Sequence, residues 1–278
     1  PCQAERLTPE RLWDLQRIGD VAVSPDGQQL AYLVTKYSIE ENQGTTSLYV
    51  QPLPTDLGSA SPVAEAPLAT AFDTPLRTAS AKAVLKDVRG LQSLSWIARP
   101  EGPRLLYIAP APAAPDDADG DKADDKQSKS TGAGQPQAWM LAADGGEPQQ
   151  LTQVAGGISN LKAAPTGQAI AFAVDVKMDP TVNELYQDLP KADARIIDSL
   201  LYRHWNAWHD YSYSHIHVVK LDGDGAASEP LDLMSSLKAD CPVPPFGGAE
   251  QFDFSPDGQQ LALTLKLVNN PAESTDTS

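Results

Sequence analysis

Residues 21–33 read Val-Ala-Val-Ser-Pro-Asp-Gly-Gln-Gln-Leu-Ala-Tyr-Leu, and residues 252–264 read Phe-Asp-Phe-Ser-Pro-Asp-Gly-Gln-Gln-Leu-Ala-Leu-Thr. The two stretches are identical from the serine through the first alanine that follows it. Proline presets φ at one turn position, aspartate can bond its own backbone, and glycine accepts positive φ. Because this turn joins two apolar runs, each stretch predicts a β-hairpin.

Two weaker copies lie between these hairpins. One leads from Leu94 through Pro100 to residues 105–108, and the other leads from Leu161 through Pro165 to residues 170–174. Further strand-like runs follow the hairpins, at residues 47–50, 138–141 and 215–219. Each unit therefore reads as hairpin, strand, turn and strand. Four antiparallel strands recurring along the chain indicate an all-β fold, a β-propeller of which about four blades are present.

Helical patterns interrupt the repeat twice. In the N-terminal segment 1–19, Thr8 is a suitable N-cap before Pro9, and Leu12, Leu15 and Ile18 share one helical face. Within the insertion 184–210, apolar residues recur at helical spacing over residues 193–202. We expect a short helix in each segment.

A third segment, residues 110–136, is dominated by Ala, Pro, Asp, Lys and Gly and has no aromatic residue. Such a composition cannot offset its own ordering entropy. We therefore expect a flexible acidic loop inside the second blade.

Composition restricts the class of partner. The chain has 278 residues, with 21 basic and 37 acidic side chains and a net charge of −16. This charge repels phosphate backbones and anionic lipid, so nucleic acid is excluded as a partner. No apolar stretch approaches the ~18 residues that a membrane helix requires, which argues against a membrane span. Two distant cysteines, Cys2 and Cys241, predict isolated thiols.

The first residue is Pro1 rather than Met. We expect an upstream segment, for example a secretory signal, and hence a periplasmic or secreted location, with the cytoplasm as the alternative.

Three stretches resemble the propeller domains of bacterial dipeptidyl and acylaminoacyl peptidases of the prolyl oligopeptidase family. The opening segment 8–27 matches theirs, residues 202–215 contain their Tyr-Arg-His-Trp signature, and residues 245–258 form the third match. Together these stretches touch the chain from end to end. The Arg-His-Trp stretch is the specific one, because Ser-Pro-Asp-Gly hairpins occur in many propellers.

The resemblance implies a two-domain serine peptidase: a propeller of seven or eight blades followed by an α/β-hydrolase domain that carries Ser, Asp and His. The partners implied are a peptide substrate and the chain's own C-terminal hydrolase domain; a homo-oligomer stays open, and no cofactor is expected. Residues 1–278 would then be a partial propeller. The chain stops where the outer strands of the fourth unit ought to begin, so we expect a truncated chain.

Hydrolysis by a serine nucleophile on such a scaffold needs a G-x-S-x-G elbow. The sequence has none; the nearest stretch, Gly157-Ile158-Ser159, has Leu161 where the second glycine should be. We therefore expect no catalytic residue in this chain.

Candidate substrate-binding residues lie in the signature region. Arg203 can form two parallel hydrogen bonds with a carboxylate, and Trp205 and Trp208 offer flat apolar surfaces. The alternative is that these aromatic rings cover the helix of the third blade. Loop carboxylates at Glu184, Glu250 and Asp188 could pair with the free α-amino group of a peptide.

A metal site is the alternative for this region. On a strand, His215 and His217 point to the same face, and Asp210 could supply an oxygen; the four histidines are His204, His209, His215 and His217. No ligand-bearing helix joins them, and the family resemblance implies no metal. We therefore prefer no metal here.

The sequence thus favours a propeller that restricts entry to, and selects peptides for, a serine exopeptidase or oligopeptidase. Whether the enzyme releases dipeptides or acylated residues stays open. The competing class is a noncatalytic propeller that binds proteins or peptides as a scaffold.

Overall fold

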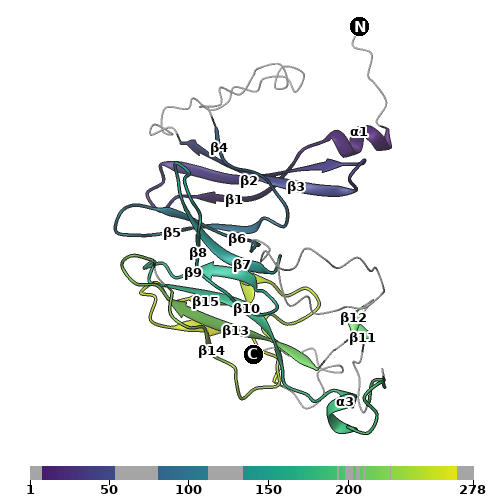
Figure 1. The fold of residues 1–278 in the computed structure, drawn as a ribbon. Coiled ribbons are helices and arrows are strands. Elements are labelled where there is room, and N and C mark those ends of the chain that lie inside the picture. Colours follow the sequence, from purple (N-terminus) through teal and green to yellow (C-terminus); the bar gives the residue numbers. More distant parts are fainter. Residues whose placement is uncertain are drawn as a thin grey trace, which may run out of the picture. The chain divides into compact units, whose positions relative to one another are not determined.

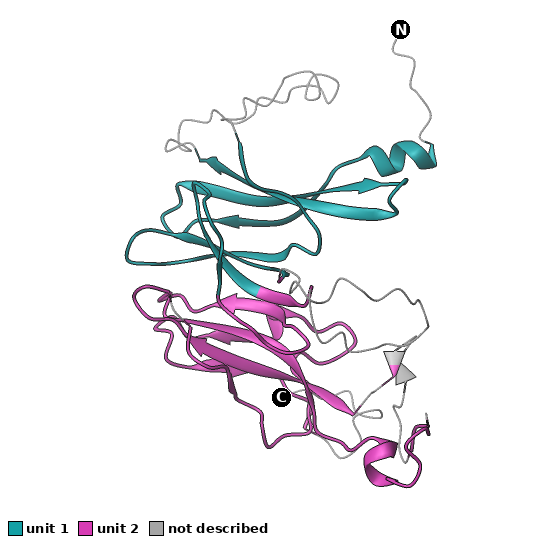
Figure 2. Cartoon of the chain, in the orientation of Figure 1, with its two compact units in different colours: residues 1–110, 138–150 teal, residues 111–137, 151–278 magenta. Residues whose placement is uncertain are grey.

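The computed structural model describes residues 8–53, 81–111, 134–192, 194–197, 203–204, 207–208, 211–225 and 227–267. They form two compact units, residues 1–110 with 138–150 and residues 111–137 with 151–278 (Figure 2). Each unit is described by itself. In the part of the chain that the structure describes, no helix is long and apolar enough to cross a membrane.

Unit 1 contains α1 (Pro9–Asp14) and two four-stranded antiparallel sheets. Both sheets are simple meanders, with neighbouring strands in sequence order (Figure 1). The first consists of β1 (Arg17–Val23), β2 (Gln29–Ser38), β3 (Gln43–Pro52) and β4 (Lys82–Val88); the second consists of β5 (Gln92–Ile97), β6 (Arg104–Pro110), β7 (Pro136–Ala142) and β8 (Gln149–Gln150).

Unit 2 contains a third four-stranded meander and the start of a fourth. The third sheet consists of β9 (Ser159–Ala163), β10 (Ala169–Lys177), β13 (Ser212–Lys220) and β14 (Leu231–Asp232); the hairpin of β15 (Phe252–Phe254) and β16 (Leu261–Leu263) follows the 3-10 turn η1 (Ala249–Gln251). A four-stranded antiparallel meander is the form of a propeller blade. The prediction of an all-β propeller is confirmed. The described residues form three blades and the first hairpin of a fourth.

The repeated sequence is also a repeated structure. Ser24 donates from its hydroxyl to Asp26 Oδ1 over 2.5 Å, and the Ser24 hydroxyl oxygen accepts from Gln29 N over 2.9 Å. Ser255 makes the same two contacts, 2.6 Å to Asp257 Oδ1 and 2.9 Å from Gln260 N. Each turn is thus fixed by its own side chains, which explains why the same letters recur.

The inner strands of neighbouring blades contact each other in unit 1. Trp96 on β5 donates from its indole nitrogen to Ala22 O on β1 over 3.0 Å, and Leu94 N donates to Asp20 Oδ2 over 3.0 Å. A buried cluster fills the space between the two sheets and includes Leu33 and Leu48. Burying each such side chain contributes roughly 1.5–3 kcal/mol.

Unit 2 repeats this arrangement. Lys162 on β9 donates to Phe252 O on β15 over 2.8 Å and lies 3.5 Å from Asp253 Oδ1. A second buried cluster, which includes Ile216 and Phe252, joins the third blade to the fourth hairpin. Within each unit the blades therefore pack through their inner strands, as a propeller requires.

The structure corrects two helix predictions. Thr8 and Pro9 begin α1 as expected, but α1 ends at Asp14 because Leu15 has an extended backbone, so Ile18 lies in β1 and not on a helical face. Residues 194–197 contain no helix. Ile196 and Ile197 are exposed there, and a short helix needs an apolar surface to pack on. Residues 198–202 lie outside the described residues.

Two other predictions fall mostly on undescribed residues. The acidic loop lies outside the described residues from 112 to 133. Its two ends are joined, because Ala111 N donates to Gln135 O over 2.9 Å. Cys241 is a free, buried thiol, and Cys2 lies outside the described residues.

Candidate functional site

The insertion between β10 and β13 of the third blade holds most of the candidate binding residues. Its two ends are joined at the base, where Tyr211 O accepts from Met178 N over 2.9 Å and from Asp179 N over 3.1 Å. Tyr211 has a φ of 61°, which lets its carbonyl face both donors. The insertion therefore leaves and re-enters the blade at one fixed point.

Asp179 connects this base to the outer part of the blade. Its Oδ2 accepts from the Tyr213 hydroxyl over 3.1 Å, and its Oδ1 forms an ion pair with Lys238. Burial and the Asp179 carboxylate raise the pKa of Tyr213 to about 12. At neutral pH the Tyr213 hydroxyl is therefore a permanent hydrogen-bond donor to Asp179.

Glu184 is used to build the insertion. It lies in α3 (Val182–Leu185), where Thr181 and Glu184 form a capping box and Thr181 N donates to Glu184 Oε2 over 2.7 Å. The other carboxylate oxygen is paired with Lys177 at the end of β10. The hydrogen bond from Lys177, and then that from Thr181 N, lowers the pKa of Glu184 to about 2. The Glu184 carboxylate therefore already has a cationic partner within the third blade.

A two-stranded hairpin brings the signature residues together. In β11 (Arg203–His204) and β12 (Ala207–Trp208), Arg203 is paired with Trp208. The Arg195 guanidinium carbon lies 4.6 Å from the centre of the Trp208 ring, within the range of a cation–π contact. Trp205 and His209 lie outside the described residues. The register places the predicted arginine and one predicted tryptophan directly opposite each other.

Glu250 lies apart in sequence from this hairpin, in η1 before the fourth repeat. It is exposed, and its Oε1 accepts from Gly248 N over 2.8 Å. Phe246, two residues before Gly248, is 77% exposed. The described contacts of Glu250 are therefore local to its own loop.

The two described histidine side chains have different environments. His215 is fully buried, with Nδ1 2.9 Å from Asp232 Oδ2 and Nε2 3.0 Å from Leu237 O. His217 stacks on Phe172, with ring centres 6.2 Å apart. Both ring nitrogens of His215 have protein partners, so this ring could bind a metal only by losing one of them. Among the described residues, no group of three or more His, Cys, Asp or Glu could hold a metal.

Cys241 is the one described cysteine side chain. Burial raises its pKa to about 11, so it is a neutral thiol at physiological pH and a poor nucleophile.

The sequence patterns did not indicate the residues that hold the insertion in place, namely Lys177, Asp179, Tyr213 and Lys238. One signal was available, because Thr181-Val-Asn-Glu184 has the spacing of a capping box. The partners of Asp179 lie 34 and 59 positions away. No local pattern could have found them.

The chain has relatives among characterised peptidases. It is 27% identical to a dipeptidyl-peptidase 5 of Porphyromonas gingivalis over 274 residues, which cover 99% of this chain and 33% of that protein. A dipeptidyl-peptidase 5 of Aspergillus fumigatus is 26% identical over 98% of this chain and 33% of its own length. The expected resemblance to a dipeptidyl peptidase is confirmed. The chain spans about a third of the length of these relatives.

No protein-family model matches the chain. Among solved structures, an acylaminoacyl peptidase from Pyrococcus horikoshii covers 80% of this chain and 26% of its own, with a TM-score of 0.46 and 10% identity. The propeller domain of the Trilobed protease from Pyrococcus furiosus covers 90% and 48%, with a TM-score of 0.39 and 9% identity.

Proposed function

We propose that this chain is part of the propeller of a serine peptidase that releases dipeptides, and that the propeller limits access to a hydrolase domain encoded elsewhere in the same protein. The observation that carries this proposal is the alignment of 99% of the chain with only 33% of a dipeptidyl-peptidase 5. The sequence has no G-x-S-x-G elbow of its own. The nucleophile must then come from another part of the protein.

Access control follows from the physical form of a propeller. A cap over an active site admits short or flexible chains and excludes folded proteins and bulk water during acyl transfer. The insertion of the third blade supports this role, because its base is fixed by Asp179 and its hairpin carries Trp208. An insertion with a fixed base and an aromatic side chain is a suitable wall for a peptide.

Within the insertion, Arg203 and Trp208 are the residues we assign to substrate. The two residues are paired in the register of β11 and β12. A guanidinium and an indole are groups that can bind a carboxylate and an apolar side chain of a peptide. We assign a smaller part to Glu184 and Glu250, whose carboxylates already accept hydrogen bonds from Lys177 and Gly248. Release of dipeptides is favoured over release of acylated residues by the names of the relatives.

The test is peptide-length selectivity in the longer protein. We expect the longer protein to cleave chromogenic dipeptide substrates and short peptides. It should leave intact a folded protein that contains the same peptide sequences. A Trp208→Ala variant should raise KM for dipeptide substrates several-fold with little change in kcat, because it removes binding surface away from the reacting bond. A Trp139→Phe variant is the control, since Trp139 donates to Ala109 O inside a blade. Equal cleavage of folded protein would contradict the gating role.

A further inference from the structure

The end of α1 holds an arginine against two aromatic rings. The Arg17 guanidinium carbon lies 4.4 Å from the centre of the Tyr37 ring and 5.7 Å from that of Trp13. The two rings meet edge to face, with centres 5.5 Å apart and an angle of 65° between their planes. Both distances lie within the range of a cation–π contact.

The local fold explains how these three side chains meet. Leu15 turns the chain out of α1, so Arg17 begins β1 opposite Thr35 of β2. Tyr37 lies two residues further along β2, on the same face as Thr35. A Cβ on Gly44 of the neighbouring strand would lie 3.0 Å from the Tyr37 ring, so a larger residue at position 44 would push this ring aside.

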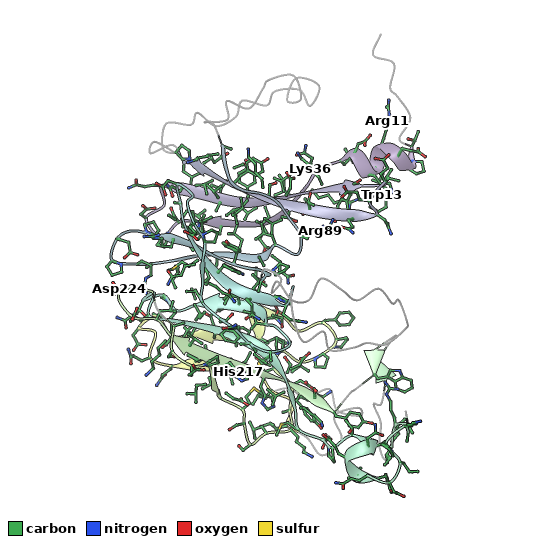
Figure 3. The ribbon with its side chains drawn as sticks, viewed as in Figure 1. Arg11, Trp13, Lys36, Arg89, His217 and Asp224 are labelled. Atoms are coloured by element: carbon green, nitrogen blue, oxygen red, sulfur yellow. The ribbon has the colours of Figure 1, made fainter. Side chains whose placement is uncertain are left out.

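The charge of Arg17 has no ion-pair partner among the described residues. The chain has 37 acidic side chains against 21 basic ones, yet within the described ranges no carboxylate forms an ion pair with Arg17. Figure 3 shows Arg11 and Lys36 at the same end of unit 1 as Trp13. Glu10, on the same helix, is held by the helix N-terminus and Thr8, which lower its pKa. Glu10 and Asp14 on α1 are acidic, so an anion would be attracted by the Arg17 guanidinium itself and not by the net charge of this end.

An apolar surface adjoins the guanidinium. Trp13 is 43% exposed, and Leu12 and Leu15 on either side of it are exposed to a similar extent. A guanidinium that stacks on aromatic rings keeps its N–H edge for two parallel bonds, which is the geometry that a carboxylate accepts. The ligand that fits combines a carboxylate with a neighbouring apolar group.

We propose that Arg17, Trp13 and Tyr37 form a binding site for the carboxylate of a short peptide, with an apolar side chain of that peptide against Trp13. The site needs only residues of this chain and does not rest on the peptidase role proposed above. The same chemistry can come from the C-terminus of a peptide or from an acidic side chain. The test therefore includes both sources.

The experiment follows the indole N–H signals of the chain by NMR. There are five tryptophans, so the Trp13 signal can be assigned from a Trp13→Phe variant. We expect N-acetyl-leucine to shift the Trp13 signal in a saturable way and N-acetyl-leucinamide, which lacks the charge, to leave it in place. N-acetyl-glutamic acid α-amide carries only a side-chain carboxylate. If it shifts the Trp13 signal less than N-acetyl-leucine does, the site prefers peptide C-termini. If its shift is at least as large, the site prefers acidic side chains.

Two substitutions separate the contribution of the positive charge of Arg17 from that of its paired N–H groups. Arg17→Gln should abolish the response, and Arg17→Lys should weaken binding about fivefold or more, because an ammonium cannot form the two parallel bonds. Arg104→Gln is the matched control, since Arg104 is already paired with Glu101. Unchanged positions of the other indole signals show that each variant is folded. An equal response to the amide, or full binding by Arg17→Gln, would overturn the proposal.

Discussion

His215 Nδ1 lies 2.9 Å from Asp232 Oδ2 inside the third blade, and this contact ties the short outer strand β14 to β13. The opposite ring nitrogen is 3.0 Å from Leu237 O, and Asp232 Oδ1 accepts from Met234 N over 2.7 Å. The imidazole and the carboxylate thus use all four of their polar positions in holding the loop after β14. This arrangement makes His215 a structural residue.

Replacing His215 should therefore destabilise the third blade strongly. His215→Leu leaves Asp232 Oδ2 and the part-buried Leu237 carbonyl without their donor, which costs roughly 3 kcal/mol. His217→Phe keeps the ring stacked on Phe172 and should cost less than about 1 kcal/mol. Urea unfolding of the chain and its two variants measures both values. Similar losses of stability from the two substitutions would show that the contact between His215 and Asp232 stabilises the blade no more than the stacking of His217 does.

Zinc should not stabilise the chain. Both nitrogens of His215 are already bonded, so a metal would gain a ligand only by breaking one of these contacts. We expect the urea midpoint to be the same with EDTA and with a slight molar excess of Zn²⁺. A midpoint that rises with zinc concentration in the original chain, but not in His204→Ala, would establish the metal alternative.

Alanine substitutions at two equivalent glycines test the contact between the turns of Thr166 and Gly258 in unit 2. Gly27 and Gly258 have φ values of 70° and 68° in identical turns, so an added Cβ strains both backbones by roughly 1–2 kcal/mol. At Gly27 that Cβ meets nothing within 4 Å, whereas at Gly258 it lies 2.7 Å from Thr166 Oγ1. Gly258→Ala should therefore destabilise more than Gly27→Ala.

The excess at Gly258 should disappear when Thr166 is shortened. In a double-mutant cycle, Thr166→Ala removes the clashing atoms, and Gly258→Ala should then cost about as much as Gly27→Ala. An excess that persists in the Thr166→Ala background would mean that the two turns do not touch in solution.

The repeated turns should also give the chain a shared acid sensitivity. Hydrogen bonds from the Ser24 and Ser255 hydroxyls, and then from backbone N–H groups, hold the pKa values of Asp26 and Asp257 below the ordinary 3.8. A carboxylate with a lowered folded-state pKa stabilises above the unfolded value and loses this contribution as pH falls through the folded value. Stability should thus decline below about pH 4.

Asparagine variants provide the check. Asp26→Asn with Asp257→Asn should flatten the stability profile measured by urea unfolding between pH 5 and about pH 2, because asparagine has no proton to gain. Glu147→Gln, at an exposed position outside the repeated turns, is the control. An acid slope that is unchanged in the double variant would locate the sensitivity elsewhere.

The parts of the fold that the sequence predicts are those with local causes. The Ser-Pro-Asp-Gly turns are fixed by contacts within six residues, and Thr8 starts α1 through a contact three residues away. Of the helix expected over 193–202, the structure describes residues 194–197, which are not helical and where Ile196 and Ile197 are exposed. A helical period is a weak signal without a packing partner.

The candidate site was harder to predict because its contacts are distant in sequence. The pairing of Arg203 with Trp208 depends on a two-residue hairpin register, and Asp179 meets Lys238 across 59 positions. The cluster of Arg17, Trp13 and Tyr37 likewise depends on where α1 ends. The sequence pattern indicated which residue types occur in the signature region. The residues that they contact are determined by the tertiary fold.

We propose that this chain belongs to a peptidase whose nucleophile lies outside it. The direct measurement is labelling with a fluorescent fluorophosphonate, applied to the chain alone and to the longer protein of which we propose it is part. We predict that the longer protein is labelled on a serine outside residues 1–278 and releases dipeptides, while the chain alone is unlabelled. Labelling of the isolated chain, or a longer protein that neither reacts nor cleaves, would contradict the account.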